Sequence, residues 1–287
     1  TRSDGHESFF DDYRSTAQIH AALHAIAQRS SAPGRAVHAE VASMGRSARG
    51  TPQLVLRLSS RLHDAKKTVY VGCLQHAREW VAAAACVHLA AFLSGGSRAA
   101  LRVLSVADVH VAPVLNPDGY AHSRSTDRMW RKTVHNSGVR GAGADMNRNW
   151  PAAMWGGAGA SRLPASEIYC GARPASEPEV SNAVAYLAHL NDGARPLALA
   201  VDVHSFGQLV LRPPGWTRAP LSDARAESRL SAAASAAAAA MSAARRQPHR
   251  AMRGWEMYPA AGSFEDWAWE ALRVPALTLE LRDTGRH

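Results

Sequence analysis

The chain has 287 residues, of which 46% are hydrophobic, and it carries a formal net charge of +9 at pH 7. This length and composition allow a large buried core, arranged as one α/β domain or two small ones, and argue against overall disorder. The basic residues are scattered along the chain and form no basic helix with interleaved aromatic residues. We therefore expect no nucleic-acid binding, although a basic surface still favours acidic partners.

Helices and strands are predicted to alternate along the chain. Hydrophobic periodicity, with Gly, Pro and capping residues as boundaries, predicts these elements in order: helix 19–27, strands 37–41, 53–59 and 68–74, helix 80–93, strand 108–115, a helix that starts at Ser176, strands 197–204 and 208–212, helices 222–246 and 264–272, and strand 275–281. The alternation predicts a single α/β domain with a mixed, mostly parallel, twisted sheet covered by helices on both faces.

Local signals refine some of these boundaries. The run 116–119 (Asn-Pro-Asp-Gly) predicts a turn that stops the strand before it. Ser176 followed by Glu179 predicts a capping box at a helix start. The Gly-rich segments 138–143 and 156–164 are expected to run over the surface of the domain.

The three cysteines do not predict a disulfide framework, because one is left over. We expect Cys73, in a strand, and Cys86, on an apolar helix, to be small buried side chains, and Cys170 to have no clear partner. No segment is long and apolar enough to span a membrane, and the longest candidate, 230–244, is expected to be a half-buried helix. The chain starts without Met or a signal peptide, so we expect a processed product or an excised piece.

Four polar residues lie at or just beyond the carboxyl ends of predicted strands: His76, Asn116, His204 and Glu280. Open α/β sheets bind their ligands at this edge, so we predict a functional site there.

His76 and Glu79 stand three residues apart directly after a predicted strand, and such a pair can point two ligands at one ion where the segment turns into a helix. Imidazole nitrogen and carboxylate oxygen are zinc ligands, and three protein ligands plus a water make a catalytic zinc site. His204 is the best third ligand, because it ends the next strongly strand-like run with a histidine. The alternative is a surface Glu at a helix start and a His that caps a strand, since this spacing also occurs by chance.

Over nearly its whole length, the chain resembles the zinc metallocarboxypeptidases of the carboxypeptidase A/B type. The matching motifs, in family order, are 45–47 (Gly-Arg-Ser), 75–80 (Gln-His-Ala-Arg-Glu-Trp), 116–120 (Asn-Pro-Asp-Gly-Tyr), 130–132 (Trp-Arg-Lys), 145–150 (Asp-Met-Asn-Arg-Asn-Trp), 204–208 (His-Ser-Phe-Gly-Gln), 258–262 (Tyr-Pro-Ala-Ala-Gly) and 280–285 (Glu-Leu-Arg-Asp-Thr-Gly).

This resemblance implies that His76, Glu79 and His204 hold one Zn²⁺ and leave a fourth position for water, whose pKa the ion lowers. It implies that Glu280 is the general base. The alternative for Glu280 is a strand-end carboxylate paired with Arg282.

The resemblance also assigns the substrate contacts. Arg131 would stabilise the developing oxyanion, although from sequence alone it fits a surface arginine in the basic run 128–132. Asn147 and Arg148 would bind the terminal carboxylate of the substrate, and Tyr258 would close over it. Without the resemblance, Asn147 and Arg148 would be only part of a polar loop. Two further substrate-binding residues are implied, Arg78 and Ser205.

Specificity depends on the position seven residues after Tyr258, which in this family lies at the floor of the pocket for the last side chain. Glu265 stands there, so we predict a preference for C-terminal Lys or Arg by direct charge pairing. Asp266 is adjacent, and a one-residue shift would exchange the two. The alternative is a preference for hydrophobic or aromatic ends.

The function predicted from this resemblance is that of a secreted, monomeric exopeptidase that acts on the C-termini of peptides or proteins. Two alternatives remain: a non-catalytic relative that binds peptide termini, and a zinc amidase for small acylated amino acids. Family members often have an inhibitory prodomain and continue through a terminal helix. We expect the catalytic domain over 1–287, with neither segment within it.

Overall fold

The structure is a computed structural model that describes residues 9–64, 67–134 and 143–282. Its strands are β1 (Val37–Arg46), β2 (Pro52–Ser60), β3 (Thr68–Cys73), β4 (Asp108–Ala112), β5 (Leu197–Ser205), β6 (Leu209–Arg212), β7 (Arg250–Arg253) and β8 (Ala276–Leu281). Its helices are α1 (Thr16–Ser30), α2 (Trp80–Ser94), α3 (Arg98–Leu104), α4 (Pro117–Ser125), the 3₁₀ turn η1 (Met146–Arg148), α5 (Pro178–Asn191), α6 (Ala224–Arg245), α7 (Gly254–Met257) and α8 (Phe264–Leu272).

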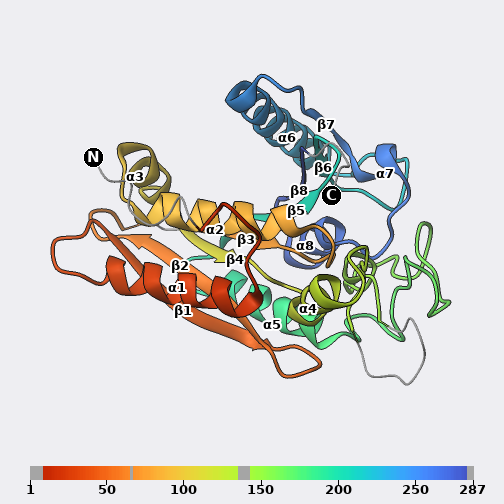
Figure 1. The fold of residues 1–287 in the computed structure, drawn as a ribbon. Coiled ribbons are helices and arrows are strands. Elements are labelled where there is room, and N and C mark those ends of the chain that lie inside the picture. Colours follow the sequence, from red (N-terminus) through yellow and green to blue (C-terminus); the bar gives the residue numbers. More distant parts are fainter. Residues whose placement is uncertain (1–8, 65–66, 135–142, 283–287) are drawn as a thin grey trace.

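The strands form one twisted eight-stranded sheet in the order β1-β2-β4-β3-β5-β8-β6-β7 (Figure 1). Its centre is parallel, because β3 pairs with β4 and β5, and β5 pairs with β8. Antiparallel pairs join β1 to β2, β2 to β4 and β6 to β8, and β6 pairs in parallel with β7. The predicted mixed α/β sheet is confirmed.

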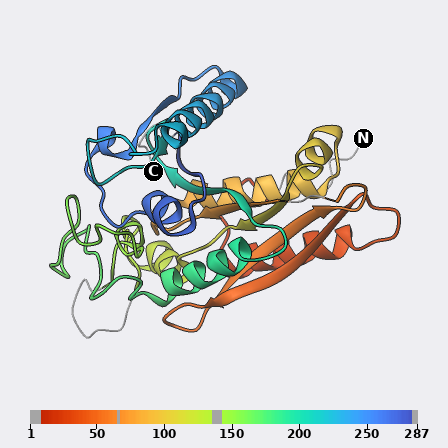
Figure 2. The same cartoon turned by 180° about the vertical axis from the view of Figure 1, so that it is seen from behind.

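Helices cover both faces of the sheet, as predicted (Figures 1 and 2). One core cluster packs Leu23 of α1 and Val87 of α2 against strand residues that include Val201. The other packs Val180 of α5 and Phe264 of α8 against the opposite face. Burial of apolar side chains between the two helical layers and the sheet is the main favourable term in such a fold.

The predicted turn at 116–119 is wrong, because this run begins α4. Asn116 is the N-cap residue, and its Oδ1 accepts a hydrogen bond from Gly119 N at 2.9 Å. Pro117 occupies the first helical turn, where its fixed φ fits and its missing N–H costs nothing. Asn and Pro therefore mark a helix start here, which is their second ordinary use.

The predicted capping box at Ser176 is also wrong. Helix α5 begins at Pro178 with Glu177 as its N-cap residue, and Glu177 makes no side-chain cap bond. Glu179 Oε1 instead accepts from Ala48 N at 3.1 Å, which ties α5 to the turn after β1. Tertiary contact has outweighed the local capping option.

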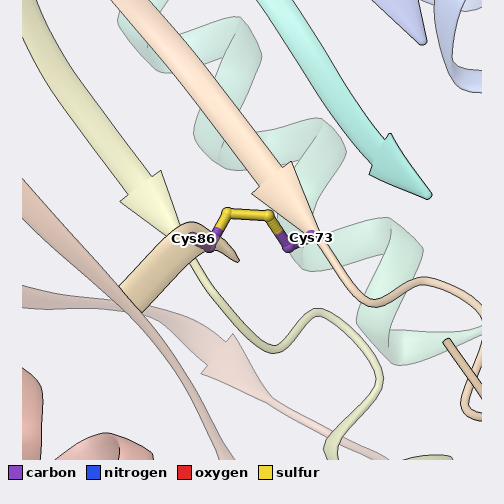
Figure 3. Close-up of a disulfide and its surroundings, with 2 residues drawn as sticks. All are labelled: Cys73 and Cys86. Carbon is purple, nitrogen blue, oxygen red and sulfur yellow. A yellow bond between two sulfur atoms is a disulfide. The ribbon is translucent and has the colours of Figure 1, made fainter. Parts of the chain in front are cut away.

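Cys73 and Cys86 are linked by a disulfide, which corrects the expectation that neither would form one (Figure 3). They are indeed buried, and their Cα atoms lie 6.5 Å apart. The bond joins the end of β3 to the middle of α2, because the helix packs back onto the strand that precedes it. Cys170 is free and buried.

Besides α4, four short elements were not predicted: α3, η1, β7 and α7. Of the predicted surface excursion over 138–143, only Gly143 is described, and residues 283–285 of the last matching motif lie outside the described residues. Within the described ranges, no single helix is long and apolar enough to cross a membrane. Helices α2 and α3, which are bent by 97° relative to each other, are long and apolar enough only when they are taken together, and by length and composition alone.

Candidate metal centre and active site

The central parallel strands bring the predicted site residues to one edge of the sheet. Strand β3 ends at Cys73, and the following loop carries His76 and Glu79 into the start of α2. His204 lies near the end of β5, in register with Glu280 on β8. Because these strands run in parallel, their carboxyl ends meet at the same edge, where open α/β sheets place their ligands.

His76, Glu79 and His204 converge on one point. Glu79 Oε1 lies 2.7 Å from His76 Nδ1, Glu79 Oε2 lies 2.9 Å from His204 Nδ1, and the two Nδ1 atoms are 3.0 Å apart. All three side chains are buried, and their ligand atoms lie within 4.8 Å of one another. Two nitrogens and a carboxylate in this arrangement can hold a metal ion, and the donor set suits zinc.

Each imidazole is held from behind by a carboxylate. His76 Nε2 lies 3.0 Å from Asp145 Oδ1, and His204 Nε2 contacts Asp202 Oδ2. Such partners fix the orientation of a metal-binding histidine and leave its other nitrogen free for the ion. The sequence analysis assigned no role to either aspartate. Asp202 could have been noticed, because residues two apart on a strand share a face.

The acidic surroundings set the charges of this cluster. Burial alone would raise the pKa of Glu79, but His76 and His204 outweigh it and lower that pKa below its ordinary value. Burial alone would lower the pKa of His204, but Asp202 and Glu79 raise it well above its ordinary value. The cluster is thus built to stabilise positive charge at its centre.

Glu280 lies beside this cluster with 8% of its surface exposed. Burial is the largest effect on this carboxyl, and it raises the pKa of Glu280 to about 7. A carboxylate poised near neutral pH can both accept and return a proton.

Arg131 is linked through Asp145 to His76, one of the three candidate metal ligands. Arg131 Nε and Nη2 donate to Asp145 Oδ2 at 3.1 and 2.9 Å, while the other oxygen of Asp145 meets His76. Burial opposes the charge of Arg131, but Asp145 raises the pKa of its guanidinium overall. The surface-arginine alternative is therefore wrong, because only 11% of this side chain is exposed.

Asn147 and Arg148 lie on η1, directly after Asp145, and both are buried. Asn147 Oδ1 accepts from Phe264 N at 2.9 Å. Arg148 Nε donates to the carbonyl of Gly159 at 2.7 Å, which orients the guanidinium.

Tyr258 lies over this guanidinium. The Cζ atom of Arg148 is 5.7 Å from the centre of the Tyr258 ring, and 43% of the tyrosine is exposed. The tyrosine therefore stands at the surface, above a buried cation.

Glu265 and Asp266 begin helix α8 and are both buried. Thr278 Oγ1 donates to Glu265 Oε2 at 3.1 Å, whereas both oxygens of Asp266 accept from Gly215 N. Burial raises the pKa of each carboxyl. A Cβ atom on Gly254 would lie 3.3 Å from Glu265 Oε1, so this glycine leaves room beside Glu265.

The two remaining predicted residues are less central. Ser205 ends β5, and its backbone N–H donates to Glu79 Oε2 at 3.1 Å. Arg78 is partly exposed, and its Nη1 donates to the carbonyl of Met129 at 3.1 Å and lies 3.4 Å from Glu167. Among the described residues, these contacts of Arg78 lead away from His76, Glu79 and His204.

The model of a protein family described as zinc carboxypeptidase matches residues 22–287. Carboxypeptidase B2 of Rattus norvegicus is 30% identical over 286 residues, which cover 98% of this chain and 65% of the relative. Carboxypeptidase A4 of Mus musculus is 34% identical over 82% of this chain and 55% of the relative. The chain thus spans a little under two thirds of the length of the first of these relatives.

Solved structures are similar as well. Bovine thrombin-activatable fibrinolysis inhibitor, in complex with tick carboxypeptidase inhibitor, matches with a TM-score of 0.84 and 30% identity over 97% of this chain and 89% of that one. The carboxypeptidase A from Helicoverpa armigera matches with a TM-score of 0.83 and 29% identity over 96% of this chain and 66% of that one.

Proposed function

Since the chain belongs to the zinc carboxypeptidase family, we propose that it is an exopeptidase that hydrolyses the last peptide bond of a substrate and releases one amino acid. Residues 1–287 would contain its catalytic domain. The observation that carries the proposal is the convergence of His76, Glu79 and His204 within 4.8 Å. Glu280 and Arg131 lie beside that cluster.

His76, Glu79 and His204 would hold the zinc ion. When bound there, zinc supplies a Lewis acid that activates water and polarises a carbonyl. Glu280 accepts the proton of the attacking water on its carboxylate and returns it to the nitrogen of the leaving amine. Its pKa of about 7 suits both transfers.

Arg131 stabilises the negative charge that develops on the carbonyl oxygen of the scissile bond. Asp145 holds the guanidinium with two hydrogen bonds, so the group needs little reorganisation during the reaction. A fixed cation at the point where charge grows lowers the barrier more than it lowers the energy of the bound substrate.

Arg148 and Asn147 bind the terminal carboxylate of the substrate, and Tyr258 closes over it. A planar guanidinium can meet both oxygens of a carboxylate. An internal segment of a peptide has no carboxylate at this point and would leave the buried Arg148 without an anion. This requirement restricts cleavage to the last residue. Arg78 and Ser205 are further residues that bind the substrate.

We also propose that Glu265 selects substrates that end in Lys or Arg. Its burial and the space beside Gly254 support this assignment, whereas Asp266 is engaged with Gly215. The test compares matched peptides that end in Arg, Lys, Phe and Leu. Faster hydrolysis of the Phe peptide than of the Arg peptide would support the hydrophobic alternative instead.

The exopeptidase proposal is tested with one peptide in two forms, with a free C-terminal carboxylate and with a C-terminal amide. We expect release of the last amino acid from the free form only, loss of activity in o-phenanthroline, and its return with zinc. Binding without hydrolysis would identify a non-catalytic relative. Cleavage of acylated amino acids but not of peptides would identify an amidase.

We further propose that the protein is a secreted monomer. The disulfide between Cys73 and Cys86 supports an oxidising compartment. The mass in solution, measured by light scattering, tests whether the protein is a monomer. The share of the expressed protein that appears in the culture medium tests secretion.

A further inference from the structure

Behind His204 lies a row of three side chains that the proposed mechanism does not use. Trp150 Nε1 donates to Gln75 Oε1 at 2.9 Å, Gln75 Nε2 donates to Asp202 Oδ2, and the same oxygen contacts His204 Nε2. No more than 1% of the surface of any of these four residues is exposed. The row is therefore a buried, continuous path of hydrogen bonds.

The direction of the bonds in this row is fixed from both ends, because an indole N–H can only donate and a carboxylate can only accept. The amide of Gln75 must then present its oxygen to Trp150 and its NH₂ group to Asp202. A carboxylate only accepts, so His204 must carry a proton on Nε2. The lone pair of His204 is thereby assigned to Nδ1, the nitrogen that faces Glu79 and His76.

We propose that Trp150, Gln75 and Asp202 form a positioning relay that sets the tautomer of His204 and aims its Nδ1 at the metal. The proposal rests on the metal ligation proposed above. The relay residues act through His204 and touch no substrate. The other imidazole, that of His76, is held independently by Asp145.

A second observation favours this role over simple packing. Asp202 Oδ1 is buried and has no hydrogen-bond partner within the described part of the chain. An unpaired buried acceptor is unfavourable, and an apolar side chain would fill the same space without that penalty. The contact with His204 Nε2 accounts for a carboxylate at this position, because it needs an acceptor that cannot donate.

The test is the affinity for zinc alone, measured by competition with a chromogenic chelator on the purified protein and on Asp202→Asn and Asp202→Leu. In Asp202→Asn, the amide oxygen can replace Oδ2 and accept from both Gln75 Nε2 and His204 Nε2, so the tautomer is kept and we expect zinc binding within a few-fold of the parent protein. In Asp202→Leu, a side chain of similar size accepts no hydrogen bond and leaves the tautomer of His204 unset. We expect this variant to bind zinc about 10–100-fold more weakly than the parent protein.

The order of the two variants separates positioning from packing. A packing role leaves Asp202→Leu close to the parent, because Leu fills the same space and creates no cavity. The relay predicts a loss of zinc binding in Asp202→Leu that Asp202→Asn does not share. Zinc binding by Asp202→Leu that equals that of the parent, or that of Asp202→Asn, would overturn it. A parent protein that binds no zinc would overturn the metal site itself.

A further variant keeps the relay testable if the Asp202 variants do not fold. Trp150→Phe keeps an aromatic ring against Phe264 and Trp267 but removes the N–H that orients Gln75. We expect zinc binding several-fold weaker than in the parent, with unchanged far-ultraviolet circular dichroism in chelator. Unchanged zinc affinity would show that the orientation of Gln75 does not depend on the indole and would overturn the relay as proposed.

Discussion

The fold contains two buried histidine clusters, and their neighbours have opposite charge. Around His204 the neighbours are the carboxylates of Asp202 and Glu79, which raise its pKa against the effect of burial. His110 on β4 lies 2.9 Å from the hydroxyl of Tyr186, and Arg57 donates to the same hydroxyl at 3.2 Å. Burial and then Arg57 lower the pKa of His110 to about 4.

The difference shows what prepares a buried histidine for a metal. Near His204, acidic groups favour added positive charge, and three donor atoms converge. Near His110, a guanidinium already supplies positive charge, and a hydroxyl occupies Nδ1. Residue type alone does not separate the two clusters, but the sign of the surrounding charge does.

The largest expected effect is on catalysis at the edge of the sheet that carries the candidate metal ligands. Glu280→Gln removes the group that we propose moves the proton, so we expect kcat to fall about 10²–10⁴-fold with zinc content unchanged. Steady-state kinetics and metal analysis measure both quantities. The matched control is Glu40→Gln beside Arg57, where we expect unchanged kcat. A fall in kcat of less than tenfold in Glu280→Gln would contradict the role of this residue.

Glu179 is a buried acid outside both clusters, and we expect its effect to lie between the largest and the smallest. Burial raises the pKa of Glu179 to about 7, and its Oε2 has no hydrogen-bond partner among the described residues. Between pH 4.5 and 7 the unfolded chain ionises here while the folded protein keeps the proton, so stability falls as pH rises. The cost is about 3 kcal/mol above pH 7.

The variant Glu179→Gln should remove this part of the pH dependence. Its free energy of unfolding in urea, compared with that of the parent at several pH values, should match at low pH and be higher by about 3 kcal/mol above pH 7. Ala48 can still donate to the amide oxygen of the new side chain. Identical pH profiles in the two proteins would contradict the shifted pKa.

The smallest effect is expected in the His110 cluster. Tyr186→Phe removes a hydroxyl that serves both His110 and Arg57, so we expect a loss of about 1–2 kcal/mol in unfolding free energy and unchanged kcat. Tyr70→Phe is the control, because the Tyr70 hydroxyl donates to Met44 Sδ, a weak acceptor, at 3.9 Å. Equal losses in the two variants would show that the shared hydroxyl adds nothing.

Much of this architecture could be predicted from sequence because the signals are local. Alternating strands and helices indicated the sheet, and residues that follow strands, such as His76 and His204, indicated its functional edge. The errors arose where one local signal has two uses, as at Asn116, which caps a helix where a turn was expected. They also arose where a distant partner decides, as for Glu179, which binds Ala48 instead of forming a capping box.

The disulfide between Cys73 and Cys86 closes a covalent ring, and both His76 and Glu79 lie inside it. A cross-link of this kind narrows the conformations open to the unfolded chain. It therefore narrows the conformations that the two proposed metal ligands, already close in sequence, can adopt before the protein folds. Reduction would release that constraint, so the metal content of a preparation should depend on its exposure to thiols as well as on the zinc supplied.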